Sequence, residues 1–265
     1  MTGLPAAFAA SSAVILAAML ALWFASVRLR DASIVDLFWG TGFALAAWTA
    51  ALATGALEPS RPRALLALAA VTLWGLRLSW HLFRRNVGHG EDRRYQAMRA
   101  GHGERFWLVS LVTVFLLQGA LVLLISLPLQ AAIAAPAAPL GPLDLLGLAV
   151  FAAGFLFEAI GDAQLRRWKA DPASRGQVMD RGLWRYTRHP NYFGDALLWW
   201  GFGLLGVAAG APWTLVSPAV MTFLLLRVSG VAMLERDIGD RRPGYRAYVA
   251  RTSAFFPWFP KEDRP

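Results

Sequence analysis

Seven apolar stretches dominate this chain of 265 residues, and each is long enough, or nearly long enough, to cross the hydrocarbon of a bilayer. A helix of about 20 apolar residues spans roughly 30 Å of hydrocarbon, whereas the core of a soluble domain needs no series of such runs. The chain therefore predicts an all-α, polytopic integral membrane protein with about seven transmembrane helices. The stretches cover residues 7–27, 34–57, 65–83, 106–131, 143–163, 192–208 and 213–233.

The composition supports the same class of protein. The chain is 57% hydrophobic and 16% charged, whereas typical soluble domains are about 45–50% apolar and about 25% charged. These values exclude an ordinary cytosolic enzyme, a disordered tail and a nucleic-acid-binding domain. The chain contains no cysteine, which excludes disulfides, thiolate catalysis and cysteine-ligated metals. No metal site is predicted.

The net charge of +9 is concentrated in a few connecting segments. Residues 84–105, residues 164–188 and the tail after residue 233 are rich in arginine, whereas the turns at 132–142 and 206–212 carry no charge. Because basic loops stay in the cytoplasm, we expect the N-terminus outside and the C-terminus inside. The basic segments are also rich in aromatic residues, which predicts a folded cytoplasmic cap of loops and short helices.

Ionisable residues within the stretches are functional candidates, because a charge in hydrocarbon costs several kcal/mol. Most lie near the predicted cytoplasmic ends of the helices, which suggests one polar cavity that opens to the cytoplasm. Pairing with neighbours or snorkelling to the interface is the alternative for each. These residues are Asp36, Arg77, His81, Glu158, Asp162, Asp195, Arg227 and Glu235.

Helical spacing places Glu158, Asp162, Arg166 and Lys169 on one stripe of the fifth helix. A stripe that runs from acidic to basic residues suits a ligand with hydroxyls and phosphates. Salt bridges within the helix are the alternative, because Asp162 and Arg166 are four residues apart.

Asp36 begins the second stretch among bulky aromatic residues. An apolar pocket favours the neutral form of a carboxyl, which could then act as an acid. The alternative is a carboxylate that interacts with the helix dipole, with Ser33 as the N-cap.

The densest motif is RGLWRYTRHPNYFGD, residues 181–195. Pro190 predicts that a helix begins near Asn191. Arginines just before a helix N-terminus make an anion site suited to phosphate, and an Asn and an Asp on the first turns suit an amide or a ribose hydroxyl. A membrane-interface anchor is the alternative. The residues concerned are Arg185, Arg188, His189, Asn191 and Asp195.

RHPNYFGD resembles the signature segment of the membrane sterol C14 reductases and the steroid 5-alpha-reductases. The whole chain is similar to the bacterial branch of the steroid 5-alpha-reductase family, through the segments VDLFWGTGF, RRNVGHGEDRRYQAMR and RTSAFFPWFP. The RHPNY core is also similar to isoprenylcysteine and phospholipid methyltransferases, which share the helical scaffold. The resemblance implies a multi-pass protein of the bacterial inner membrane, with residues 1–265 as a single membrane domain.

The resemblance implies NADPH as the cofactor, with residues 106–265 as the cofactor side. Asn191 matches the asparagine that contacts the nicotinamide end, and Arg227 matches an arginine near the end of the last span. Lys169 takes the place of an arginine, whereas Glu158 and Val231 depart from the family's pattern. Arginine forks match phosphate oxygens, which makes Arg85, Arg94, Arg166, Arg185 and Arg188 candidates for the cofactor phosphates. The complete set of candidate cofactor-binding residues is Asp162, Arg166, Lys169, Arg185, Arg188, His189, Asn191, Tyr192, Asp195, Arg227, Glu235, Tyr245, Tyr248, Arg85, Arg94 and Tyr95.

For the substrate, the resemblance implies residues 1–105. Asp36 is the counterpart of a glutamate that acts with a tyrosine to polarise a 3-keto group. The position of that tyrosine falls near Trp74, so the catalytic candidates are Asp36, Trp74 and His81. The substrate expected is a steroid-like molecule or another lipid.

The expected function is therefore NADPH-dependent reduction of an activated C=C bond in a lipid. A SAM-dependent membrane methyltransferase is the alternative, and a non-enzymatic lipid-binding protein is the second alternative. Several arginines favour NADPH, because arginine forks match phosphate oxygens and SAM has no phosphate. The cost of buried acids disfavours a mere scaffold. Membrane lipids and the substrate are the expected partners, without nucleic acid, and the oligomeric state stays open.

Overall fold

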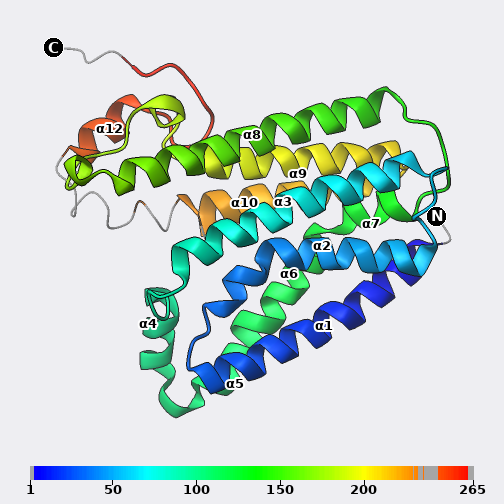
Figure 1. The fold of residues 1–265 in the computed structure, drawn as a ribbon, viewed down its shortest axis with the longest axis horizontal. Coiled ribbons are helices and arrows are strands. Elements are labelled where there is room, and N and C mark those ends of the chain that lie inside the picture. Colours follow the sequence, from blue (N-terminus) through cyan, green and yellow to red (C-terminus); the bar gives the residue numbers. More distant parts are fainter. Residues whose placement is uncertain (1–2, 229, 232–234, 236–243, 262–265) are drawn as a thin grey trace. The chain divides into compact units, whose positions relative to one another are not determined.

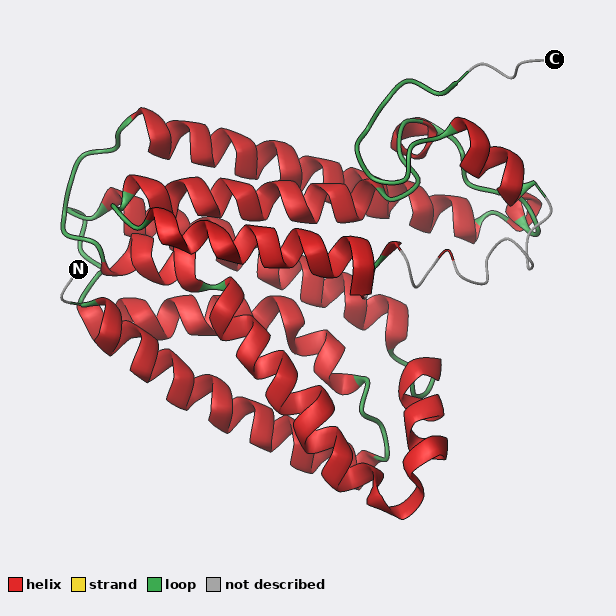
Figure 2. Cartoon of the chain, turned by 180° about the vertical axis from the view of Figure 1, so that it is seen from behind, coloured by secondary structure: helices red, strands yellow, loops and turns green. Residues whose placement is uncertain are grey.

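A computed structural model describes residues 3–228, 230–231, 235 and 244–261. Within these residues every regular element is helical and none is a β-strand (Figures 1 and 2). The all-α prediction is confirmed. Residues 229 and 232–233 of the seventh apolar stretch, and residues 236–243 of the basic tail, lie outside the described part.

Five helical segments are long and apolar enough to cross a membrane, which indicates a membrane-embedded protein. The sixth predicted stretch forms α9 (Pro190–Ala208), and the seventh corresponds to a shorter apolar segment, Pro212–Val228. The total of seven spans therefore stays a prediction. The five segments are α1 (Leu4–Leu29), α2 (Ile34–Thr54), α3 (Pro62–Asn86), Arg93–Ile125 and α8 (Pro142–Ala170).

The chain divides into two compact units, and the first comprises residues 1–144 and 205–214. In this unit α2 packs against both α1 and α3 (blue to cyan in Figure 1). A Cβ atom on Gly40 would lie 2.4 Å from the carbonyl oxygen of Gly75, so α2 and α3 approach this closely only because both residues are glycine.

The fourth apolar stretch is a series of short helices rather than one regular helix. Residues 106–144 belong to the first unit because α6 and α7 pack against the N-terminal helices. A π-helix, η2, interrupts the series, and such widened turns frequently occur at functional sites. Two elements precede the stretch, α4 (Arg93–His102) and η1 (Gly103–Arg105). The stretch itself forms α5 (Phe106–Ser110), η2 (Leu111–Leu116), α6 (Leu117–Ile125) and α7 (Leu127–Ala134).

The second unit comprises residues 145–204 and 215–265. Here α8 and α9 lie in close contact, since a Cβ atom on Gly194 would lie 2.4 Å from the backbone nitrogen of Glu158. Small residues permit this approach between membrane helices, and it brings the start of α9 against the polar end of α8. The remaining elements are η3 (Pro172–Ser174), η4 (Gly182–Arg185), η5 (Pro212–Leu215), α10 (Val216–Phe223), the π-helix η6 (Leu224–Val228) and α12 (Tyr245–Arg251).

Candidate functional site

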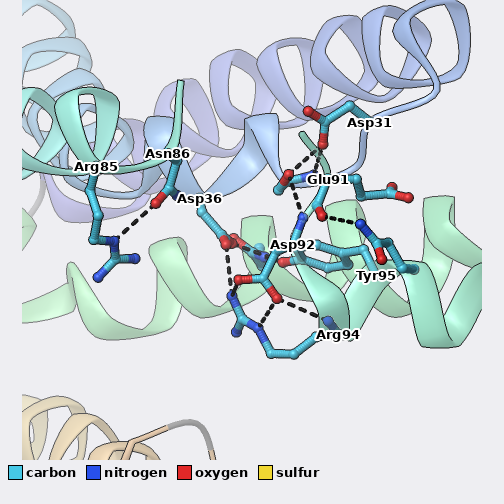
Figure 3. Close-up of polar contacts among 11 residues, drawn as sticks. Asp31, Asp36, Arg85, Asn86, Glu91, Asp92, Arg94 and Tyr95 are labelled. Carbon is cyan, nitrogen blue, oxygen red and sulfur yellow. Dashed lines mark hydrogen bonds and ion pairs between the residues drawn. The ribbon is translucent and has the colours of Figure 1, made fainter. Parts of the chain in front are cut away.

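The described residues form a polar cluster in each unit, and the cluster of the first unit is centred on Asp36. Asp36 lies in the first turn of α2. The Tyr95 hydroxyl donates a hydrogen bond to Asp36 Oδ1 at 2.8 Å, and Arg94 Nη2 donates to Asp36 Oδ2 at 2.9 Å (Figure 3). Tyr95 is only 6% exposed. The fold thus joins a carboxylate, a phenol and a guanidinium, which the sequence had placed in separate catalytic and cofactor-binding groups.

Gln118 completes this cluster and was not predicted from the sequence. It lies in the first turn of α6, directly after the π-helix η2, and its Nε2 donates to the Tyr95 hydroxyl oxygen at 3.3 Å. A neutral amide in an apolar stretch carries no charge, so the pattern of intramembrane charges does not mark it. Its polarity within the fourth stretch was the signal that could have identified it.

The loop before α4 is fastened to the turn between α1 and α2. The Ala32 backbone nitrogen donates to Glu91 Oε1 at 2.8 Å, and Arg99 Nη2 donates to the same oxygen at 2.8 Å. The Asp92 backbone nitrogen donates to Ser33 Oγ at 3.2 Å. Burial raises the pKa of the Glu91 carboxyl, but hydrogen bonds from Arg99 and Ala32 outweigh burial and lower it. These contacts hold α4, and with it Tyr95, beside the start of α2.

Ser33 is the N-cap residue of α2, as the alternative interpretation of Asp36 expects, but its side chain makes no capping hydrogen bond. The Ser33 hydroxyl donates to Asp31 and accepts from the Asp92 backbone. It is therefore engaged by the loop before α4, while the Asp36 carboxylate in the first turn of α2 is turned to Tyr95 and Arg94 (Figure 3).

The other candidates of the first unit lie on α3. Trp74 is fully buried against Phe43, with ring centroids 5.7 Å apart, as expected of a core residue. His81 is half-buried on the same helix, and Arg85 is exposed, with its Nε donating to Asn86 Oδ1 at 2.9 Å. The phenol that contacts Asp36 in the structure belongs to Tyr95, whereas the family resemblance implies a phenol near Trp74.

The cluster of the second unit is centred on Glu235. Arg188 donates to both of its carboxylate oxygens, at 2.7 and 2.9 Å, and His189 Nε2 lies 2.9 Å from Oε1. Burial raises the pKa of Glu235, but the hydrogen bonds from His189 and Arg188 and their charge outweigh burial and lower it to about 2. Arg188 is buried, and its Nη1 donates to the backbone oxygens of Val249 and Thr252. Its guanidinium is therefore engaged by the protein on every nitrogen.

Of the two tyrosines of α12, Tyr245 contacts the same cluster and Tyr248 contacts the segment that precedes Arg188. The Tyr245 hydroxyl donates to Glu235 Oε1 at 3.4 Å, and the Tyr248 hydroxyl donates to the backbone oxygen of Trp184. Burial, together with the negative charge of Glu235, raises the pKa of Tyr245 to about 12. Both tyrosines were predicted as cofactor-binding residues, and the structure places them where they close α12 onto the segment 184–189.

The RHPNY segment binds directly to α8. Asn191 Nδ2 donates to Asp162 Oδ1 at 3.1 Å, and Trp184 Nε1 donates to the Gly161 backbone oxygen at 3.0 Å. Asp162 is buried. The predicted start of the sixth helix is confirmed, because α9 begins at Pro190. Two residues that the family resemblance assigns to the cofactor are thus in contact with each other.

The remaining candidates differ in exposure. Tyr192 stacks on His189 with ring centroids 5.6 Å apart, and Asp195 is buried in α9. The guanidinium group of an exposed arginine is suited to bind phosphate oxygens. Among the described residues, no group of three or more His, Asp or Glu side chains could hold a metal ion. The exposed cationic candidates of this unit are Arg166, Lys169, Arg185 and Arg227.

Comparisons with known proteins give the family. Residues 22–252 match the family described as "Protein of unknown function (DUF1295)". An uncharacterised protein of Schizosaccharomyces pombe is 27% identical over 270 residues, which covers 89% of this chain and 75% of that protein. No solved structure matches the chain. Because the family match covers most of the sequence, the chain belongs to the DUF1295 family, which is a steroid 5-alpha-reductase-like family.

Proposed function

We propose that this protein is an NADPH-dependent reductase of an activated C=C bond in a steroid-like or other lipid substrate. The observation that carries the proposal is the contact between the Tyr95 hydroxyl and the Asp36 carboxylate. A buried phenol beside a carboxylate, with an arginine over its ring, can donate a proton to a substrate carbonyl once its hydroxyl hydrogen turns from the carboxylate to that carbonyl. The family membership supports this class of reaction.

The chemistry assigned to the first unit is polarisation and protonation. Reduction of an enone adds a hydride at the β carbon, which NADPH supplies when bound, and charge then develops on the carbonyl oxygen. The one hydroxyl hydrogen of Tyr95, which is donated to Asp36 in the structure, would turn to that oxygen when the substrate binds. Gln118, which donates to the hydroxyl oxygen, would orient the hydroxyl. Arg94 holds Asp36 from the other carboxylate oxygen.

The residues of the second unit fit the chemical groups of NADPH. The Asn191–Asp162 pair offers amide and carboxylate groups that match a carboxamide or a ribose hydroxyl. Exposed Arg166 and Arg185 offer forks for phosphate oxygens. Arg188 was predicted to bind the cofactor, but in this proposal it does not bind phosphate, because Glu235 and backbone oxygens engage its guanidinium. It would position the loop that carries Asn191.

The test is ligand-dependent thermal stability of the purified protein in lipid nanodiscs. NADPH should raise the melting temperature, and SAM should not. Asn191→Ala should still fold, with a somewhat lower melting temperature because Asp162 loses a hydrogen bond, but NADPH should no longer raise that temperature. A stabilisation by SAM alone would overturn the reductase proposal.

The methyltransferase alternative is favoured by one contact, the pairing of Glu235 with Arg188 and His189 of the RHPNY segment. Such a carboxylate could hold the amino-acid or ribose part of SAM. The same melting experiment separates the two functions, because the arms use SAM and NADPH separately. If neither ligand stabilises the protein, a non-enzymatic lipid-binding role takes their place.

We also propose the membrane topology that the charges indicate, with seven spans, the N-terminus outside and the C-terminus in the cytoplasm of a bacterial inner membrane. The arginine-rich segments 84–105 and 164–188 support this orientation, since positive loops stay inside. A C-terminal reporter active only in the cytoplasm should be active, whereas activity of a reporter that works only outside the cytoplasm would contradict the topology.

A further inference from the structure

The C-terminal segment 253–261 presents a group of exposed aromatic side chains. Phe256, Trp258 and Phe259 are 65%, 73% and 77% exposed. Among the described residues, Trp258 and Phe259 are the most exposed large apolar side chains. Single apolar residues are common on protein surfaces, but a contiguous exposed group marks an interaction surface.

The backbone of this segment is fixed to the rest of the second unit. The Trp258 backbone nitrogen donates to the Tyr186 oxygen at 2.9 Å, and the Arg188 backbone nitrogen donates to the Ser253 oxygen at 2.9 Å. Thr187 Oγ1 donates to the Phe255 oxygen at 2.8 Å. The aromatic side chains are therefore held outward by a hydrogen-bonded backbone.

The length of α8 indicates where the boundary of the hydrocarbon crosses this helix, and the depth of residues 253–261 in the bilayer follows from that boundary. The helix has 29 residues, which is about 43 Å at about 1.5 Å per residue, whereas the hydrocarbon core is only about 30 Å thick. The excess lies at the end that carries Arg166, Arg167 and Lys169, because these cations favour water or headgroups. The hydrocarbon boundary then falls roughly 20 residues into the helix, close to Gly161.

The segment 181–190 contacts α8 at this boundary. Trp184 Nε1 donates to the Gly161 oxygen at 3.0 Å, and the Leu183 backbone nitrogen donates to Gln164 Oε1 at 2.9 Å. The C-terminal segment is hydrogen-bonded to Tyr186 and Thr187 of the same loop. Its aromatic side chains thus lie near the depth at which aromatic belts of membrane proteins occur.

The charges around the aromatic group suit a lipid surface. Arg181 and Arg185 are exposed on the loop 181–190, and Lys261 is exposed on the segment 253–261. The nearby Asp180 is paired with Arg251. Cations next to interfacial aromatic residues are attracted to anionic headgroups.

We propose that residues 253–261 form an interfacial anchor, in which Phe256, Trp258 and Phe259 insert into the headgroup region of the bilayer. The anchor holds the backbone of residues 186–188 and so fastens the Arg188–Glu235 cluster to the membrane surface. This role is independent of the proposed reductase activity.

The absence of cysteine makes the test direct, because one introduced cysteine gives a single labelling site. Trp258→Cys and, separately, Phe259→Cys are labelled with a nitroxide in nanodiscs of phosphatidylcholine and phosphatidylglycerol. Ala173→Cys, at an exposed position of η3, is the control in the same unit. Collisions with oxygen and with a water-soluble nickel chelate are then measured by EPR.

Labels at 258 and 259 should collide more with oxygen and several-fold less with the nickel chelate than the label at 173. Equal accessibility of all three labels to nickel would overturn the anchor. So would labels at 258 and 259 that are shielded from both reagents, because that result would mean that protein, such as a second copy of the chain, covers the surface. Two separate variants keep the test decisive if one of them fails to fold.

Discussion

The Tyr95 hydroxyl lies 2.8 Å from Asp36 Oδ1, although the two residues are 59 positions apart in the chain. The contact depends on the loop before α4, whose Glu91 and Asp92 are fastened to the turn before α2. In this arrangement the carboxylate of Asp36 and the amide of Gln118 both contact the Tyr95 hydroxyl. This geometry leads to two predictions about the proposed reduction.

Tyr95→Phe should remove the proton donor and leave the fold intact. General acid catalysis contributes about 100-fold or more to a rate, so we expect a fall of about that size in NADPH-dependent reduction of an enone lipid. NADPH-dependent stabilisation should be unchanged, because Asn191 and Asp162 lie in the other unit. Tyr186→Phe is the matched control and should retain activity. A Tyr95→Phe enzyme with the wild-type rate would assign proton transfer to another group.

Gln118→Leu should slow the reaction without abolishing it. The amide donates one neutral hydrogen bond to Tyr95, and such bonds contribute about 1 kcal/mol, so a loss of about 5- to 10-fold in kcat is expected. Thr113→Val is the control, because the Thr113 hydroxyl only donates to the Val109 backbone within the same helical series. If both variants lose activity equally, Gln118 acts through the helix rather than through Tyr95.

The sequence predicted those features that depend on local patterns. The long apolar runs identified the membrane helices, and Pro190 identified the start of α9. Asp36 was identified because a carboxyl in an apolar stretch is costly. The partners of these residues depend on tertiary packing, which no local pattern contains. Tyr95 was assigned to the cofactor for that reason.

Arg188 is a second residue whose tertiary partners could not be predicted from the local sequence. In the sequence it is a cation before a helix, which suggests a phosphate ligand. In the fold its guanidinium is occupied by Glu235, 47 residues further along, and by backbone oxygens of Val249 and Thr252. A count of arginines alone therefore overstates the number that are open to a ligand.

Asp144→Asn should strongly destabilise the first unit. Arg63 donates to both carboxylate oxygens at 2.6 and 2.9 Å, and the Asp144 side chain is 1% exposed. Removing one charge of a buried pair leaves the other unpaired, which costs about 3–5 kcal/mol. The double variant Arg63→Met with Asp144→Leu should recover much of the loss. Thermal unfolding in nanodiscs measures both, and equal stability of Asp144→Asn and wild type would show that the pair contributes nothing.

The Glu235 cluster should make the second unit sensitive to acid. The pKa of Glu235 is about 2 in the fold, against an ordinary value of 4.5. A carboxyl whose pKa is lowered by folding stabilises the fold above its ordinary pKa, and this contribution is lost as the pH falls towards the folded value. The melting temperature should therefore fall between about pH 5 and pH 2.

Glu235→Gln isolates this effect, because glutamine keeps the size of the side chain but cannot ionise. The variant should melt at a lower temperature at neutral pH, since Arg188 would lose its bidentate partner and His189 and Tyr245 would lose an anionic acceptor. Its melting temperature should also change less steeply than that of wild type below pH 5. Glu104→Gln, at an exposed position of η1, is the control and should keep the wild-type slope. An unchanged acid slope in Glu235→Gln would mean that other carboxylates, such as Glu91, determine the acid sensitivity.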